Sequence, residues 1–271
     1  SFIRKASEKG VAIASFNVHN LETIQAVAEG AAEERCPVII QTTPGTLKHA
    51  GINYIAAMVK AASELYNIPM ALHVDHCSSF ETIMQCIRCG YTSVMIDASK
   101  HELHENIRIT KEVVDYAHSK GVSVEAEVGH IGGTEDNITA SSSNATLEDC
   151  LTLVNGTGID SLAPALGSVH GLYKGDPDLD FETMAEINDN LAIPLVLHGG
   201  TGIPDYDIKK AISCGISKIN INTELQIAWH EAVKKFIEEN PNAYDPRKVI
   251  GSGKEAMKAK VKEKVEMFNN K

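Results

Sequence analysis

Three histidines and an aspartate occupy positions where a metal-dependent reaction needs them. His76, His170 and His198 each follow a short apolar run that is typical of a buried strand, and Asp75 directly precedes His76. Neutral imidazole nitrogens suit Zn²⁺, and three protein ligands leave a fourth coordination position open for a substrate. The three histidines therefore predict one catalytic Zn²⁺ site.

Two further side chains belong to the strand that precedes His76. Asp75 either orients a ligand histidine or exchanges a proton with the substrate, and its place beside a metal favours proton exchange. His73 is two residues earlier than Asp75 and therefore points to the same face of the strand. Its role is either support of the metal ligands or packing.

The chain alternates between strand-like apolar runs and segments with helical spacing. The expected strands begin near Val11, Val38, Pro69, Thr92, Val122, Ile159, Pro194 and Ser217. Eight such units in 271 residues predict the α/β class and a (β/α)₈ TIM barrel rather than a doubly wound sheet. We expect a single domain over residues 1–271, with a C-terminal helical extension after Asn240.

Local signals predict where this barrel has helix starts and loops. Ser78-x-x-Glu81 has the spacing of a capping box at the start of a helix. Residues 134–145 are polar and predict a long loop. In such a barrel, the functional groups lie at the carboxyl ends of the strands.

Two glycine-rich segments are candidates for substrate contacts. Residues 199–202 are either a simple turn or a phosphate site, and the phosphate site is favoured because residues 220–223 end the next strand. Residues 132–136 begin the long polar loop. They belong either to a solvated acidic loop or to a mobile lid that carries a carboxylate to the substrate.

Composition limits the classes of partner. The net charge of −11 argues against nucleic acid and anionic membranes, although a phosphorylated substrate remains compatible with it. No run of about 18 apolar residues predicts a transmembrane helix, and the first residues lack a signal-peptide pattern. The six cysteines predict reduced thiols, including the pair Cys86 and Cys89, and we expect a cytoplasmic protein.

Five segments together resemble the class II, zinc-dependent ketose-1,6-bisphosphate aldolases. They are residues 72–80, 123–129, 163–171, 196–202 and 218–224. The resemblance implies a (β/α)₈ barrel that forms a homodimer or homotetramer. It also implies reversible cleavage of a sugar bisphosphate to the triose phosphates dihydroxyacetone phosphate and glyceraldehyde 3-phosphate, with the zinc ion stabilising the negative charge that cleavage produces.

The same resemblance implies a role for individual residues. Asp75 would exchange a proton with the C4 hydroxyl, and Glu135 would handle the C3 proton from a lid, with Glu127 as the next candidate. Asp97 and Glu127 would form a second cation position, with a monovalent cation, Na⁺ or K⁺, as a further candidate cofactor. The implied substrate contacts are Asn17, Gly171, Gly199, Gly200, Asn220, Asn222, Thr223 and Arg247. Arg247 would reach the far phosphate across a dimer interface.

The choice of sugar rests on weaker signals. Residues 17–25 and 43–49 are more similar to tagatose-bisphosphate aldolases, whereas residues 163–176 and 245–248 are more similar to the fructose enzymes. We expect tagatose 1,6-bisphosphate, with the fructose-1,6-bisphosphate aldolase of glycolysis as the alternative. Two other classes stay open, namely a metal-dependent barrel hydrolase and a non-catalytic barrel that binds sugar phosphates.

Overall fold

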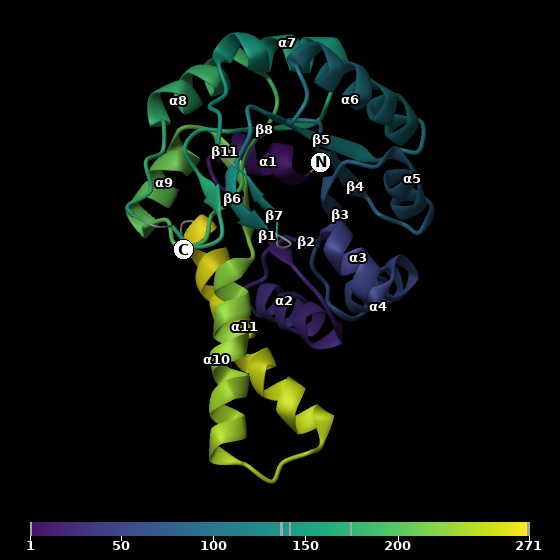
Figure 1. Cartoon of the computed structure of the whole chain (residues 1–271), viewed down its shortest axis with the longest axis vertical. Coiled ribbons are helices and arrows are strands. Elements are labelled where there is room, and N and C mark those ends of the chain that lie inside the picture. Colours follow the sequence, from purple (N-terminus) through teal and green to yellow (C-terminus); the bar gives the residue numbers. More distant parts are fainter. Residues whose placement is uncertain (1, 136–137, 141, 174, 270–271) are drawn as a thin grey trace.

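Eight parallel strands close into a barrel in the computed structural model, which describes residues 2–135, 138–140, 142–173 and 175–269 (Figure 1). The neighbours around the barrel follow the order β1-β11-β10-β8-β5-β4-β3-β2. The strands are β1 (Ile13–Asn17), β2 (Val38–Thr42), β3 (Met70–Cys77), β4 (Ser93–Ile96), β5 (Ser123–Val128), β8 (Ser161–Pro164), β10 (Leu195–Leu197) and β11 (Ile216–Ile221). The predicted (β/α)₈ barrel is therefore confirmed.

Helices surround the barrel, and their apolar faces bury the outer surface of the strands (Figure 1). They are α1 (Phe2–Glu8), α2 (Leu21–Glu33), α3 (Pro44–Ala50), α4 (Ile52–Leu65), α5 (Phe80–Arg88), α6 (Leu103–His118), α7 (Leu147–Thr157), α8 (Phe181–Asn190), α9 (Asp205–Ser213), α10 (Thr223–Glu239) and α11 (Pro246–Phe268). Among the helices of the described residues, none is long and apolar enough to cross a membrane.

One end of the barrel is closed by apolar packing. Helix α1 places Ala6 against Ile13 of β1 and Ile39 of β2, and Phe2 and Ile3 pack around them. Above this layer the strands turn polar side chains such as Gln41 inward. The apolar plug therefore leaves the opposite end of the barrel, at the carboxyl ends of the strands, as the open end.

A small second sheet covers part of that open end. It consists of β6 (Gly132–Glu135) and β7 (Ile138–Ala140), which pair as an antiparallel hairpin, and β9 (Val169–His170), which is parallel to β6. The sequence predicted a loop over 134–145, so this part of the prediction is wrong. The backbone pairing explains the difference, because a polar hairpin can be held by its ladder without an alternating apolar face.

The predicted C-terminal helical extension is confirmed as α11, which forms a long hairpin with α10 that projects from the barrel (Figure 1). The returning part of α11 packs against α2, where Gly30 leaves room for Val261. The N–H of Ala12 donates to the carbonyl oxygen of Phe268 at 3.0 Å. The end of the chain is therefore fixed to the first barrel strand.

The helix cap predicted at Ser78 is shifted by one residue. Ser79 is the N-cap of α5, and its hydroxyl accepts a hydrogen bond from the backbone N–H of Thr82 at 3.2 Å. Strand β3 continues to Cys77, so Ser78 still belongs to the turn at the barrel mouth. The side chain of Ser78 consequently does not cap the helix.

Candidate metal centre and active site

The three histidines predicted as metal ligands lie together at the carboxyl ends of the strands. His76 lies near the end of β3, His170 lies in β9 and His198 directly follows β10. One ring nitrogen of each lies within 4.8 Å of the corresponding atoms of the other two. Nε2 of His76 and Nδ1 of His198 are only 2.8 Å apart. Residues more than a hundred positions apart therefore converge on one small volume.

The backbone at His76 is specially shaped for this role. Its φ angle is +47°, in the left-handed region that costs about 1–2 kcal/mol for a residue with a Cβ atom. The pairing register between β3 and β4 shifts at this point, between Val74 and Cys77. The N–H of His76 is turned to the sulfur of Met95 at 3.3 Å. The irregularity aims the imidazole into the barrel mouth.

Two glycines allow the strand of His170 to approach its neighbours closely. Gly199 has a φ angle of +63°, and a Cβ atom there would lie 2.2 Å from the carbonyl oxygen of Val169. Gly133 has a φ angle of +103°, and a Cβ atom would lie 2.2 Å from the carbonyl oxygen of His170. Only glycine fits at both positions, so both glycines set the place of His170.

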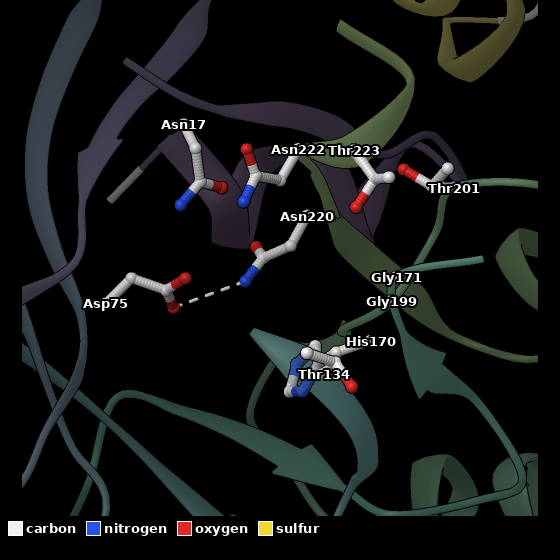
Figure 2. Close-up of a pocket in the computed structure, with 10 residues that line it drawn as sticks. All are labelled: Asn17, Asp75, Thr134, His170, Gly171, Gly199, Thr201, Asn220, Asn222 and Thr223. Atoms are coloured by element: carbon white, nitrogen blue, oxygen red, sulfur yellow. Dashed lines mark hydrogen bonds between the residues drawn. The ribbon is translucent and has the colours of Figure 1, made fainter. Parts of the chain in front are cut away.

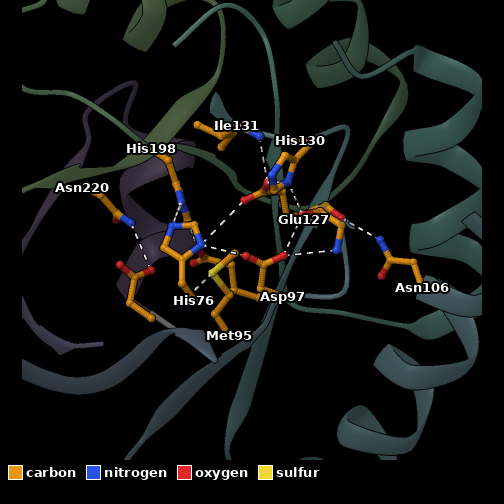
Figure 3. A network of polar contacts seen from close by, with 12 residues as sticks. His76, Met95, Asp97, Asn106, Glu127, His130, Ile131, His198 and Asn220 are labelled. Carbon is orange, nitrogen blue, oxygen red and sulfur yellow. Dashed lines mark hydrogen bonds and ion pairs between the residues drawn. The ribbon is translucent and has the colours of Figure 1, made fainter. Parts of the chain in front are cut away.

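Two carboxylates, the half-buried Asp97 and the buried Glu125, orient two of the histidine rings. Asp97 Oδ2 lies 2.9 Å from Nδ1 of His76, and Glu125 Oε1 lies 2.9 Å from Nε2 of His198 (the His76–Asp97 contact is drawn in Figure 3). An ionised carboxylate can only accept, so each of these ring nitrogens carries the hydrogen. The other nitrogen of each ring then presents its lone pair to the shared volume. This arrangement is common around metal-bound histidines.

The donor set fits a divalent metal. Nε2 of His76 and Nδ1 of His198 face each other as two acceptors, and such a pair needs a cation or a proton between them. Burial keeps the pKa of His170 well below its usual value, and it also lowers the pKa of His198 despite the hydrogen bond to Glu125. Rings held neutral in this way are ready to bind a metal, and three nitrogens suit Zn²⁺.

The predicted second cation position shares one residue with the first. His76, Asp97 and Glu127 also offer ligand atoms within 4.8 Å of one another. Burial raises the pKa of Glu127 to about 8, and the negative charge of Asp97 adds to the effect. Its Oε1 accepts from the N–H of Ile131 at 3.0 Å, whereas its buried Oε2 has no hydrogen-bond partner (Figure 3). An oxygen atom therefore remains available for a cation.

Asp75 lies beside the histidines in a network of amides. Its carboxylate is buried and accepts from Nε2 of Gln41 at 3.0 Å and from Nδ2 of Asn220 at 3.3 Å (the second bond is drawn in Figure 2). The same Gln41 amide donates to Oδ1 of Asn17 at 2.7 Å. Asp75 is thus held in one orientation at the edge of the cavity.

A cavity next to Asp75 brings most of the predicted substrate residues together (Figure 2). Its lining contains Asn17, Asp75, Thr134, His170, Gly171, Gly199, Thr201, Asn220, Asn222 and Thr223. Asn222 and Thr223 stand at the start of α10, so the amino end of a 17-residue helix borders the cavity. The positive end of the helix dipole favours an anion there.

Three residues that the sequence predicted for the site are not seen in the lining of this cavity. Gly200 is not part of the cavity lining, and its N–H donates to the carbonyl oxygen of Asn220 at 3.1 Å. Arg247 lies at the start of α11, where its exposed guanidinium pairs with Asp245 at 2.8 Å, and it is not among the residues that line the cavity. The backbone of Glu135 ends β6, but its side chain lies outside the described residues.

Sequence reasoning missed several polar residues inside the barrel. Gln41 holds Asp75, and Glu125 pairs with both His198 and Lys218. Thr134 and Thr201 line the cavity. A charged residue in the middle of an apolar strand was the available signal for Glu125 and Lys218. The partner of each could not be read from the chain.

Asp97 provides a direct test of the metal centre. In Asp97→Asn the shape is kept, but the negative acceptor for Nδ1 of His76 is lost, so divalent metal should bind roughly 10- to 100-fold more weakly. Titration against a chelator of known affinity measures the change. Asp115→Asn, on the exposed face of α6, is the matched control and should bind metal like the parent. Equal affinities in the two variants would contradict the assignment.

Known proteins match the chain along its length. The family model described as fructose-bisphosphate aldolase class-II covers residues 1–271. A fructose-bisphosphate aldolase from Geobacillus stearothermophilus is 52% identical over 263 residues, which are 96% of this chain and 92% of the relative. The corresponding protein of Staphylococcus aureus is 50% identical over 267 residues, covering 97% and 93%.

Solved structures agree with these matches. The crystal structure of the YdjI aldolase from Escherichia coli K12 aligns with a TM-score of 0.86 at 36% identity, over 98% of this chain and 94% of that one. The fructose-bisphosphate aldolase of Campylobacter jejuni aligns with a TM-score of 0.85 at 28% identity, over 99% and 93%. The chain therefore belongs to the class II fructose-bisphosphate aldolase family, whose members are lyases that require a divalent metal ion.

Proposed function

We propose that this aldolase reversibly cleaves fructose 1,6-bisphosphate to dihydroxyacetone phosphate and glyceraldehyde 3-phosphate. The observation that carries the proposal is the convergence of three histidines with Asp75 beside a cavity suited to an anion. Membership of a lyase family sets aside the two alternatives of a barrel hydrolase and a non-catalytic binding barrel.

Fructose replaces tagatose as the preferred sugar. The sequence favoured tagatose from residues 17–25 and 43–49, but the relatives at 50% identity and above are named for fructose bisphosphate. The two sugars differ only in configuration at C4. The discriminating contacts therefore belong to the groups around Asp75, where Gln41 and Asn220 fix the carboxylate.

His76, His170 and His198 would hold the divalent metal, with Zn²⁺ favoured by three nitrogen donors. When bound, the metal supplies a Lewis acid that stabilises negative charge on the substrate oxygens during cleavage. Asp97 and Glu127 would hold a second cation, for which Na⁺ or K⁺ remains our prediction. Oε2 of Glu127, which accepts no hydrogen bond and lies 4.0 Å from Nδ1 of His76, supports this position.

Two proton carriers are required, because cleavage of the C3–C4 bond removes a proton from the C4 hydroxyl and adds one at C3. Asp75 would take the hydroxyl proton, since it lines the cavity together with His170. Glu135 would supply the C3 proton. Its place at the end of β6, next to the strand of His170, supports that role.

The cavity would hold the dihydroxyacetone phosphate half. Backbone N–H groups at Gly171 and Gly199 and the start of α10 can surround a phosphate without a cationic side chain. Asn17 and Asn220 would orient the hydroxyl groups. This local arrangement explains how a chain with a net charge of −11 accepts an anionic substrate.

A second cavity, of about 610 Å³, would hold the glyceraldehyde phosphate half. It also borders His76 and His170, and Lys48 of α3 and Lys100 of the loop after β4 stand along its rim. Both lysines line this second cavity and neither lines the cavity at the start of α10. They are therefore suited to the far phosphate of a bisphosphate.

The predicted role of Arg247 would require a second copy of the chain. Its guanidinium is exposed at the far part of the α10–α11 hairpin and pairs only with Asp245 among the described residues. We keep the homodimer or homotetramer as part of the proposal, with Arg247 reaching the far phosphate of a neighbouring site. The cytoplasmic location also stays a prediction.

A Schiff-base mechanism is disfavoured by the state of Lys218. This residue is the lysine inside the barrel, but its ammonium donates to Glu125 at 2.8 Å and is fully buried. An ammonium held in this way lacks the lone pair needed to attack a carbonyl group. The three-histidine site already provides the stabilisation of negative charge.

The sugar assignment is tested by a coupled assay for triose phosphates. With divalent metal present, we expect a higher kcat/KM for fructose 1,6-bisphosphate than for tagatose 1,6-bisphosphate, and chelation should abolish both activities. Borohydride added with substrate should trap no lysine adduct. A preference for tagatose would overturn the sugar assignment, and a trapped adduct would overturn the mechanism.

The two proton carriers are separated by isotope exchange. Glu135→Gln should stop solvent hydrogen exchange into dihydroxyacetone phosphate while binding remains, because it acts at C3. Asp75→Asn should keep this exchange but reduce cleavage by about 10²- to 10⁴-fold, because it acts on the other fragment. Deuterium incorporation is measured by mass spectrometry. Normal exchange in Glu135→Gln would shift the role to Glu127.

The proposed contact of Lys48 and Lys100 with the far phosphate is tested with substrates that differ by one phosphate. Lys48→Ala and Lys100→Ala should each raise KM for fructose 1,6-bisphosphate by roughly 3- to 10-fold, since exposed charge pairs contribute about 1 kcal/mol. Cleavage of fructose 1-phosphate should not change. Lys60→Ala, on the exposed face of α4, is the control. A parallel change with both sugars would contradict a phosphate-specific role.

A further inference from the structure

Lys218 carries a positive charge in the interior of the barrel that the reaction itself does not use. Its side chain is 1% exposed, and its Nζ atom lies 2.8 Å from Oε2 of Glu125, which is equally buried. The two residues come from β11 and β5, which are not adjacent in the barrel. Their contact therefore crosses the interior and joins two of its walls.

The carboxylate of Glu125 also contacts His198, one of the proposed metal ligands. Oε1 of Glu125 lies 2.9 Å from Nε2 of His198, while its Oε2 receives the ammonium and, at 3.4 Å, the hydroxyl of Ser161. On the other side of the imidazole, Nδ1 of His198 faces Nε2 of His76. A continuous chain of polar contacts thus runs from Lys218 to the volume shared by the three histidines.

The direction of the His198 ring depends on the place of the Glu125 carboxylate. Because Oε1 lies 2.9 Å from Nε2 of His198, the hydrogen on that nitrogen is donated to it and the lone pair of Nδ1 is left for the metal. An oxygen enclosed in the barrel interior is costly without a partner, so the carboxylate keeps this place only if its other oxygen is bound as well.

Lys218 is the residue that binds this second oxygen most closely. His73, Asp75 and Glu125 offer atoms within 4.8 Å of one another, so two carboxylates and an imidazole are enclosed together. Lys218 is the buried cation that pairs with this group in the described part of the chain. The long side chain of Lys218 places its ammonium beside Glu125, outside the volume shared by the three ligand histidines.

We propose that Lys218 is a positioning residue that anchors Oε2 of Glu125, so that Oε1 stays against Nε2 of His198 and Nδ1 is directed at the metal. The proposal rests on the ligand role proposed for the three histidines. It adds that the geometry of the metal centre is set by a side chain two contacts away from it. Lys218 acts through Glu125 and His198 and touches neither metal nor substrate.

Metal titration and the absorption spectrum of the Co²⁺-substituted protein test this role in the full chain. Lys218→Met keeps an unbranched side chain without the charge, and Glu125→Gln keeps the shape of the acceptor without its charge. Each should weaken Co²⁺ binding by roughly 10- to 100-fold and shift the visible bands, which report the arrangement of the nitrogen ligands. Parent-like affinity and bands in Lys218→Met would overturn the proposal.

A matched control distinguishes positioning from general stability. Lys264 of α11 is another buried lysine, and its ammonium pairs with Glu224 at 3.2 Å, outside the group around Glu125. Lys264→Met should lower the melting temperature but leave Co²⁺ affinity and bands unchanged. If Lys264→Met changes the bands as Lys218→Met does, the effect is a general loss of a buried ion pair and the proposal is wrong.

A further variant covers the case in which Lys218→Met does not fold. The double variant Lys218→Met/Glu125→Gln leaves no unpaired charge, so it avoids the cost of a lone buried carboxylate. It should fold, bind Co²⁺ weakly and show shifted bands, whereas parent-like bands would overturn the proposal. If the parent itself binds no divalent metal, the ligand set fails as well, which separates that result from a failure of Lys218 alone.

Discussion

Burial of ionised side chains is the constraint on which this site depends. The barrel interior holds Asp75, Glu125 and Glu127 almost without exposure to water. A carboxylate in such surroundings is costly unless donors or cations meet its oxygens. Amides donate to Asp75, an imidazole and an ammonium contact Glu125, and one oxygen of Glu127 accepts no hydrogen bond. These different partners are the physical basis for proposing a different role for each of three chemically similar groups.

The backbone satisfies a second constraint, which is the close approach of elements at the barrel mouth. His76 adopts a left-handed conformation that its neighbours impose through the break between β3 and β4. Gly133 and Gly199 let β9 lie against both β6 and the end of β10. A strained backbone at His76 and glycines at the contacts of β9 are two ways of fixing the relative positions of the histidine side chains.

The sequence predicted those features that depend on local pattern. Alternation of apolar runs with helical segments identified the barrel, and polar residues at the ends of apolar runs identified His76, His198 and Asp75. Glu125 and Lys218 were not linked, because 93 residues separate them and their contact depends on which strands face each other across the barrel. The β6–β7 hairpin was missed because its residues are polar and its stability comes from backbone pairing with β9. The position of Arg247 depends on the path of a long hairpin, which local pattern does not encode.

The backbone pairing between β6 and β9 joins the hairpin that carries Glu135 to the strand that carries His170. Gly133 pairs with His170, so the strand that leads to Glu135 shares its backbone hydrogen bonds with a proposed metal ligand. A metal that fixes His170 would also reduce the conformational freedom of the hairpin. By thermodynamic reciprocity, that metal and a substrate that contacts the hairpin would increase each other's affinity by the same factor. Occupancy of the metal position would then decide how much ordering of the hairpin is left for substrate binding to bring about.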